Sequence, residues 1–524
     1  MNQNTFHPLF LKTKAFLKRN AVYLIGFFVI FITVWRLRGT YEFAVTPNRG
    51  VKLAIYLYFF IGFAAICFTM AKTKKLHLIF LVMTAVLGIG FMLALPLQLI
   101  PDEMVHYMRA YDIADGNFIA AANATGGVIR EFPGNLFIGG NNYQEYFSKI
   151  GFQLDYVNTT ENPYTSAALY SPLSYLPQAL GIFIARLFTD NSMAIFYTAR
   201  IFNFAFGSAL VYFAIKLIPF GKFTVFTIAL MPMFLHQQIS LSADVITNSL
   251  ALFSVALALK ISHEECKHSK RYLALLSVCL IVMTMCKIVY LLFILLIFTV
   301  PSNLFRNKRN AWIFKISILL AALAVNMVWF AISSRYFVEF RDGVNIAEQV
   351  KFVLSNPITY LWLLLKTFID SFPTFFSAMI GFMLGPLTIA VSSWSYLTYM
   401  FIFIIAVCIT CDNQRIKKSF KVVQAILFAG TAVLICSALY AQWNPVGVPY
   451  IDGIQGRYFI PIILPFALFV PQLLPLRKAT EKGDEDAAAL TCPAIETTGK
   501  HKMLIIFMLF ANFIALSDII VYFC

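Results

Sequence analysis

A run of ionisable and aromatic residues, PDEMVHYMR, follows a strongly apolar stretch and predicts a helix opened by a proline and two acids. On that helix Asp102, His106 and Arg109 share one face, and Glu103 and Tyr107 share the neighbouring stripe. Carboxylates and imidazoles transfer protons, and a guanidinium binds anions. The run therefore indicates either a reactive helix face or an acidic first turn favoured by the helix dipole alone.

The composition is typical of a polytopic helical membrane protein. Hydrophobic residues make up 60% of the 524 residues and charged residues only 13%, and the mean hydropathy is +0.76. The formal charge of +16 would suggest nucleic acid as a partner of a soluble chain. Here, however, Lys and Arg cluster between apolar runs in the positive-inside pattern, so we expect membrane lipids and no nucleic acid as partners.

Apolar runs separated by basic clusters predict an all-α fold with about thirteen crossings. A basic cluster precedes the run 21–35, which we interpret as a retained first span with its N-terminus in the cytoplasm. Two further runs then place Asp102 outside. The predicted divisions are accessory spans at 1–77, a core at 78–475 with a large outer loop at 101–170, a charged cytoplasmic loop at 476–502 and a last span at 503–524.

Four other segments carry specific structural expectations. Residues 170–188, with two prolines, predict a short helix at the outer interface, and residues 223–239 predict one outward span. The segment 271–300 has more residues than one membrane span needs and fewer than two full spans need. This length indicates a hairpin of short helices with Lys287 at its outer tip. Residues 361–384, broken by a proline and glycines, are expected to lie along or dip into the outer leaflet.

This topology gathers ionisable residues from distant parts of the chain at the outer face. Each of three of these residues also has a purely structural explanation. Asp244 could cap its helix, Lys287 could extend its ammonium to the headgroups, and Arg457 could anchor a helix at the interface. Their agreement on one side favours a substrate path. The gathered residues are Asp102, Glu103, His106, Arg109, Asp244, Lys287 and Arg457.

Ordered motifs across about residues 78–474 give the chain a family resemblance. The chain resembles the bacterial membrane family catalogued as domain of unknown function 2142, which is in turn similar to the GT-C superfamily of polyprenyl-phosphate-sugar glycosyltransferases. The first two spans and the C-terminal tail lie outside the resemblance. The motifs are PDExxHYxRAYxIAxG at 101–116, YSPLSYLPQALG at 170–181, Ser-Ala-Asp at 242–244, KIVYL from Lys287, IGFMLG from Ile380 and QGRYFIP at 455–461.

The resemblance implies a GT-C-like membrane enzyme with its active site on the outer face of a bacterial cytoplasmic membrane. The donor would be a sugar on a lipid phosphate such as undecaprenyl phosphate, and the acceptor a cell-surface glycan or glycolipid. Asp102 is the first choice for the catalytic base, with Glu103 as substitute or partner. Lys287, Arg457 or Arg109 would stabilise the departing phosphate.

The remaining predicted substrate contacts are an imidazole, a carboxylate and four aromatic side chains. His106 would either orient Asp102 or touch phosphate. Interface packing explains the tyrosines as well as sugar stacking does. Besides His106, these residues are Asp244, Tyr107, Tyr170, Tyr175 and Tyr458.

Neither a metal nor another cofactor is expected, because a lipid phosphate can leave without a metal. Asp102, Glu103 and Asp244 could nevertheless jointly hold a divalent cation. The main alternative function is a lipid-linked oligosaccharide flippase, polymerase or ligase in cell-envelope polysaccharide assembly. A solute transporter is a further alternative, although that class usually shows internal repeats, which are not evident in this sequence.

Overall fold

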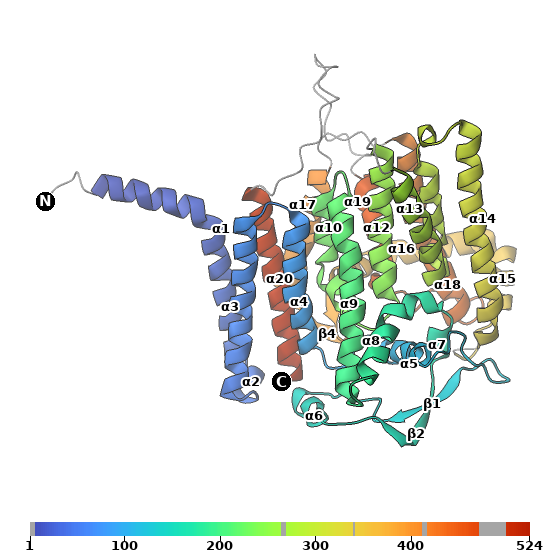
Figure 1. The fold of residues 1–524 in the computed structure, drawn as a ribbon, viewed down its shortest axis with the longest axis horizontal. Coiled ribbons are helices and arrows are strands. Elements are labelled where there is room, and N and C mark those ends of the chain that lie inside the picture. The colour runs from blue at the N-terminus through green and yellow to red at the C-terminus, as the bar shows by residue number, and fades with distance from the viewer. Residues whose placement is uncertain (1–5, 264–268, 339–340, 411–416, 471–498) are drawn as a thin grey trace, which may run out of the picture.

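The computed structural model describes residues 6–263, 269–338, 341–410, 417–470 and 499–524 as a bundle of long helices (Figure 1). Within these residues, nine helices are long and apolar enough to cross a membrane, and three shorter apolar stretches accompany them. The prediction of an all-α polytopic membrane protein is therefore confirmed. The nine are α1 (Phe6–Gly39), α3 (Arg49–Lys72), α4 (Leu76–Ala94), α9 (Ser192–Leu217), α12 (Asp244–His263), α14 (Lys308–Ser333), α16 (Pro357–Ile380), α18 (Lys418–Trp443) and α20 (Gly499–Phe523).

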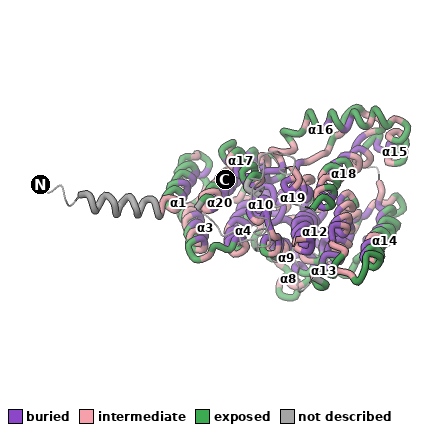
Figure 2. Tube along the Cα trace, turned by 90° about the horizontal axis from the view of Figure 1, so that it is seen from above, coloured by how far each residue is buried: buried purple, intermediate pink, exposed green. Residues whose placement is uncertain are grey.

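One of the nine long helices, α16, lies across the others. Figure 2, which looks along the bundle, shows α9 and α12 end-on but α16 along its length. Exposed apolar side chains recur along one face of α16, from Ile358 and Leu361 to Ile369 and Phe372. That residues 361–384 lie along or dip into the outer leaflet stays a prediction. The preceding helix is α15 (Ile346–Ser355).

A hairpin of two different helix types places Lys287 at its tip, as predicted. α13 (Ser269–Cys286) is an 18-residue α-helix and η2 (Ile288–Thr299) a 12-residue 3₁₀-helix. At rises of about 1.5 and 2.0 Å per residue, the two legs span roughly 27 and 24 Å. The tighter winding of η2 thus makes a short segment nearly long enough to cross the hydrocarbon layer of about 30 Å.

The prediction of one continuous span over residues 223–239 is wrong. The segment forms two short helices, α10 (Lys222–Ala229) and α11 (Pro232–Gln238). Pro232 has no backbone N–H to donate and its ring opposes a continuous helix, so the chain breaks just before it. The carbonyl of Leu230, freed by the break, accepts a 3.0 Å hydrogen bond from Asn512 of α20.

The outer loop predicted at 101–170 is a folded subdomain at one end of the bundle, which we call the loop end. It contains α5 (Glu103–Ala114) and a two-stranded antiparallel sheet that the sequence reading did not predict. Strand β1 pairs Phe132 with Thr160 of β2. Aromatic side chains such as Tyr107 and Tyr164 fill its core. The other elements here are β1 (Ile129–Gly134), β2 (Asp155–Pro163), α6 (Tyr143–Ser148), α7 (Thr165–Ala168), η1 (Pro172–Tyr175) and α8 (Leu176–Arg186).

The terminal helices pack together on one flank of the bundle, where Figure 1 shows α1, α3, α4 and α20 side by side. Arg36 of α1 forms an ion pair with Asp518 of α20. The same carboxylate accepts a hydrogen bond from the backbone N–H of Ser392 at the start of α17. The remaining elements are α2 (Tyr41–Val45), η3 (Ser302–Leu304), η4 (Ser334–Tyr336), β3 (Met383–Leu384), β4 (Ile389–Ala390), α17 (Ser393–Thr410), η5 (Gly456–Phe459) and α19 (Ile460–Phe469).

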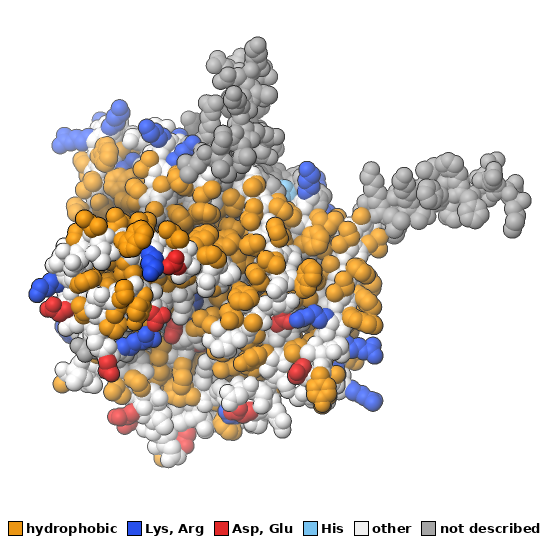
Figure 3. Space-filling model, turned by 180° about the vertical axis from the view of Figure 1, so that it is seen from behind, with side chains coloured by type: hydrophobic (Ala, Val, Ile, Leu, Met, Phe, Trp, Pro, Cys, Tyr) orange, Lys and Arg blue, Asp and Glu red, His pale blue; other side chains and the backbone are white. Residues whose placement is uncertain are grey.

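The surface separates apolar from charged side chains. On the face seen from behind, hydrophobic side chains cover much of the bundle, Lys and Arg lie along its upper edge, and both basic and acidic side chains lie in its middle and lower parts (Figure 3). Lys417 marks the end opposite the loop end, because its ammonium donates to the carbonyl of Ser262 near the end of α12. Since α12 begins at Asp244, about 27 Å of helix separates that residue from Ser262.

Candidate active site

Asp102 lies at the mouth of the bundle, directly before α5. Its backbone is left-handed, with φ 62° and ψ 3°, a conformation that Asp adopts more readily than most residues. The helix therefore begins at Glu103, two residues later than a helix with Pro101 as its first residue. The carboxylate of Asp102 turns away from the helix, is 56% exposed, and accepts a 2.6 Å hydrogen bond from Arg457 Nη2.

Arg457 reaches Asp102 from η5 and is itself buried. Its guanidinium also approaches the carbonyl of Pro101 and Oε1 of Gln237, each at 3.4 Å. The preceding residue, Gly456, lets η5 pack directly against the backbone of α16, because a Cβ there would overlap the carbonyl of Phe375. The close approach of α16 therefore fixes where Arg457 lies.

A second ion pair joins Lys287, at the hairpin tip, to Asp244, at the start of α12. Both side chains are almost fully buried, at 11% and 9% exposed. The ammonium also lies over two tyrosine rings, 5.1 Å from the centroid of Tyr170 and 5.4 Å from that of Tyr458. These contacts indicate a desolvated cation held by one carboxylate and two aromatic faces.

His106 stands among these charges. Its Nδ1 shares a 2.7 Å hydrogen bond with the hydroxyl of Tyr175. Burial lowers the pKa of His106 to about 4; the carboxylates of Asp102 and Asp244 oppose this shift, and the cations Lys287 and Arg457 add to it. His106 is therefore neutral at pH 7.

The carboxylate of Asp102 stays ionised at neutral pH. Burial raises its pKa, but the charge and hydrogen bond of Arg457, the charge of Lys287 and, once it is protonated below about pH 4, the charge of His106 outweigh burial and leave the pKa below its ordinary value. We call the five interacting groups the charged cluster. Its members are Asp102, His106, Asp244, Lys287 and Arg457.

Glu103 belongs to a different interaction. Its carboxylate is fully buried and binds Arg200 of α9 through two hydrogen bonds of 2.6 and 2.9 Å. It also accepts from the backbone N–H groups of Leu241 and Gln98, at 3.1 Å each. Arg200 in turn donates to the carbonyl of Leu95. Glu103 and Arg200 thus fasten together the end of α4, the start of α5 and the turn before α12.

Two further predicted site residues lie in the core of the loop end. Arg109 is fully buried, forms an ion pair with Asp112 at 3.1 Å, and donates to the carbonyls of Asn117 and Phe118. Tyr107 is also fully buried, with its ring 4.5 Å from that of Phe196. The structure therefore separates Glu103, Arg109 and Tyr107 from the charged cluster, and Tyr170, Tyr175 and Tyr458 surround it.

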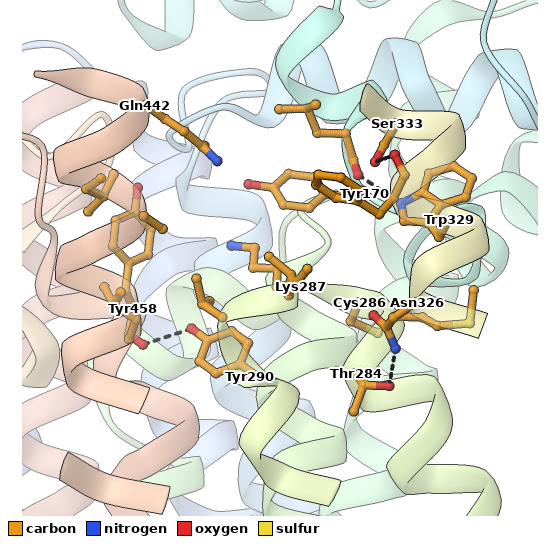
Figure 4. Close-up of a pocket in the computed structure, with 18 of the residues that line it drawn as sticks. Tyr170, Thr284, Cys286, Lys287, Tyr290, Asn326, Trp329, Ser333, Gln442 and Tyr458 are labelled. Carbon is orange, nitrogen blue, oxygen red and sulfur yellow. Dashed lines mark hydrogen bonds between the residues drawn. The ribbon is translucent and has the colours of Figure 1, made fainter. Parts of the chain in front are cut away.

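A cavity of about 240 Å³ opens beside Lys287, between the hairpin, α14 and α18 (Figure 4). We call it the Lys287 cavity. Its walls combine apolar residues with Tyr170, Trp329, Gln442 and Tyr458. The sequence did not single out Trp329, which lies within an apolar run, or Gln442, which directly follows one. It also missed Arg200, although a lone arginine inside the apolar run of α9 is itself a signal of a buried partner.

Each carboxylate once considered for a shared metal site is bound to its own cation. Asp102 pairs with Arg457, Glu103 with Arg200 and Asp244 with Lys287. In the described parts of the chain, no three His, Cys, Asp or Glu side chains are grouped so that they could hold a metal ion.

The fold and the charged cluster define a polytopic helical membrane protein with an ionised site at one end of its bundle. The chain belongs to the family described as predicted membrane protein, DUF2142, whose model matches residues 85–466. The matched region contains every member of the charged cluster and Arg200, but not α1, α3 or α20. No curated protein and no solved structure matches the chain.

Proposed function

We propose that this protein is a membrane glycosyltransferase. It would transfer a sugar from a polyprenyl-phosphate donor to a hydroxyl group of a cell-surface glycan or glycolipid. The observation that carries the proposal is the pairing of Asp102 with Arg457, which holds an ionised, half-exposed carboxylate beside buried cations. Such a carboxylate can receive a hydroxyl proton, and the cations can receive an anionic leaving group.

The reaction balances with groups of the charged cluster. The acceptor hydroxyl would donate a hydrogen bond to Asp102 while its oxygen attacks the anomeric carbon of the donor sugar. The bond from that carbon to the phosphate oxygen breaks, its electron pair leaves with the lipid phosphate, and the hydroxyl proton passes to Asp102. Lys287 and Arg457 would stabilise the charge of the departing phosphate.

The lowered pKa of Asp102 makes its carboxylate a weak base that is already ionised when the acceptor hydroxyl arrives. The carboxylate is ionised before substrate binds, so it is ready to orient the acceptor hydroxyl. Proton transfer then has to accompany attack, since the hydroxyl becomes acidic only as its oxygen bonds to carbon. This timing suits an oxocarbenium-like transition state in which the leaving phosphate departs early.

The distribution of basic residues supports an outer location for the site. Lys417 lies near the end of α12 opposite Asp244, and Lys308 begins α14 at the same side. Because basic clusters favour the cytoplasmic side, the loop end and its charged cluster would face outward. The proposed setting is the outer face of a bacterial cytoplasmic membrane.

The test is transfer of radiolabelled sugar from a panel of polyprenyl-phosphate sugars in membranes that contain the full-length protein. Wild type should transfer a sugar, and Asp102→Asn should lower the rate about 10²–10⁴-fold, as expected for loss of a general base. Glu161→Gln is the matched control, because Glu161 is an exposed carboxylate on β2. Equal rates for wild type and Asp102→Asn would refute the assignment.

A second candidate is a lipid-linked oligosaccharide flippase, polymerase or ligase. The break between α10 and α11, with the buried polar side chains of His236 and Gln237, is a feature that transporter-like proteins also use near their substrates. If no donor sugar is consumed, translocation of a fluorescent lipid-linked oligosaccharide across proteoliposome membranes would distinguish this candidate.

A further inference from the structure

We propose that the Lys287 cavity receives a single sugar ring and selects sugars without a cationic amino group. The inference rests on the proposed function in one respect, that the ring is the one carried by the donor. It goes further by assigning the recognition groups and the charge class of the sugar. Gln442, Trp329 and Tyr170 are the recognition groups, and Lys287 sets the charge preference.

Polar groups from three separate elements point into the same space. Gln442 of α18 directs its amide toward Lys287 and the hydroxyl of Tyr170 (Figure 4). No described residue hydrogen-bonds to the Gln442 amide or to the Tyr170 hydroxyl. An amide and a phenol each donate and accept hydrogen bonds, which matches the hydroxyl groups of a sugar. Unpaired groups of this kind at a cavity wall are available to a ligand.

Aromatic walls supply the complementary apolar surface. Trp329 is fixed in orientation, because its indole N–H donates to the carbonyl of Leu169 at 3.0 Å. The ring of Tyr170 lies beside Trp329, and that of Tyr458 lies on the other side of the Lys287 ammonium (Figure 4). A pyranose presents C–H groups on its faces and hydroxyls at its edge, so it can use the rings and the polar groups together.

The charges around the cavity disfavour an ammonium group. Lys287 is the one charged side chain among the described residues that line the cavity. The neighbouring carboxylate of Asp244 is already bound to Lys287, and that of Asp102 to Arg457. A protonated amino sugar in the cavity would therefore face the like charge of Lys287 with no carboxylate among the described lining residues, whereas a neutral or acidic sugar would meet no such repulsion.

The size of the cavity is suited to one sugar ring. Its volume of about 240 Å³ far exceeds the roughly 10–15 Å³ that one water needs. It lies below the approximately 300–1,000 Å³ of sites that enclose drug-sized ligands. An oligosaccharide would have to extend outside it.

The experiment measures binding of soluble sugar 1-phosphates to the purified full-length protein in lipid nanodiscs by titration calorimetry. The probes are glucose 1-phosphate, glucuronic acid 1-phosphate, glucosamine 1-phosphate and inorganic phosphate. We expect the first two to bind at least 10-fold more tightly than glucosamine 1-phosphate and inorganic phosphate. Gln442→Ala should weaken glucose 1-phosphate about 10-fold, and Gln144→Ala, which truncates an exposed glutamine of α6, should not.

Several outcomes would overturn the inference. These are equal binding of inorganic phosphate and glucose 1-phosphate, equal binding of the amino sugar, an unaffected Gln442→Ala, and absence of binding. If farnesyl phosphate displaces glucose 1-phosphate equally well from wild type and from Gln442→Ala, the cavity binds a lipid chain instead of a sugar. Binding is measured without turnover, so the two proposals can fail separately. Selective binding without sugar transfer would reject the proposed glycosyltransferase function but not the cavity assignment. Sugar transfer without selective binding would reject the cavity assignment but not the proposed function.

Discussion

Asp102 and Glu103 are consecutive in the chain, yet their carboxylates bind different arginines from different helices. Asp102 faces Arg457 at the open mouth of the bundle, and Glu103 faces Arg200 in the interior. The left-handed backbone at Asp102 is what turns the two side chains apart. One carboxylate is thereby left accessible to an acceptor while its neighbour is committed to holding the loop end in place.

Breaking the interior pair should destabilise the protein strongly. Glu103→Gln and Arg200→Met should each lower the free energy of unfolding by about 3–5 kcal/mol, because each leaves one buried charge uncompensated. Both side chains are fully buried, so solvent cannot compensate. The double variant Glu103→Gln/Arg200→Met should lose less than the sum of the two single changes. Denaturant unfolding of the purified variants measures this, and strict additivity would show that the pair is not coupled.

Removing Arg457 should move the acid limb of the transfer rate to higher pH. Arg457 is the largest favourable influence on ionised Asp102, so Arg457→Met should raise the pKa of that carboxyl. Wild type should keep its rate until the pH falls below the ordinary carboxyl range, whereas the variant should lose rate at a higher pH. A pH–rate profile of each provides the comparison. Coincident acid limbs would mean that Asp102 is not the titrating base.

His106 should make stability depend on pH in a defined window. Its pKa is about 4 in the folded protein and near 6.5 when unfolded, so between these values the unfolded chain binds a proton that the folded chain does not. The free energy of unfolding should therefore fall as the pH is lowered from about 6.5 to 4. His106→Gln should flatten this part of the profile. An unchanged slope in thermal unfolding at a series of pH values would contradict the burial of a neutral imidazole.

Lys287→Met should slow sugar transfer and also destabilise the fold, because it leaves the nearly buried carboxylate of Asp244 without its partner. Loss of one preorganised cationic contact to a leaving group should lower the rate about 10²–10³-fold, by analogy with loss of a single charge-stabilising donor. Lys287→Arg keeps the charge next to Asp244 and should recover part of the rate. The comparison needs initial rates at saturating donor and a check of folded protein by thermal unfolding. Equal losses in both variants would place the role of Lys287 in packing rather than charge.

The contact between η5 and α16 can be tested with one methyl group. Gly456→Ala would push its Cβ into the backbone of α16 at Phe375, so we expect a loss of about 1–3 kcal/mol and a reduced transfer rate because Arg457 shifts. Gly39→Ala is the control, since a Cβ at Gly39 would meet nothing within 4 Å. Similar unfolding of both variants would show that α16 gives way without affecting the site.

The sequence predicts the parts of the site that depend on topology. Lys287 at a hairpin tip and Asp244 at a helix start follow from segment lengths and basic clusters, and the QGRYFIP motif places Arg457 at a helix start. These rules act locally or along the membrane normal, so they can be applied without knowing which helices are neighbours.

Pairing between distant residues could not be predicted in the same way. Glu103 and Arg200 lie 97 positions apart, and which of two adjacent acids turns inward depends on the backbone at Asp102. The β1–β2 sheet carries polar side chains on both faces, so it lacks the alternating pattern that identifies strands. The sequence shows Pro232, which opposes a continuous helix. The carbonyl that the break leaves without a helical partner is satisfied by Asn512 on the last helix, and that contact is not visible in the sequence.

The hydrogen bond from Asn512 to Leu230 bears on how much of the chain is needed for a stable fold. A chain trimmed to the residues shared with the family would lack α20 and leave the carbonyl of Leu230 facing hydrocarbon, where an unsatisfied backbone group is costly. It would also remove the acceptors of Ser392 and Ser395, which anchor the beginning of α17. We therefore expect the family-matched region alone to fold less stably than the full chain, because α20 supplies hydrogen-bond partners to the break before Pro232 and to the start of α17.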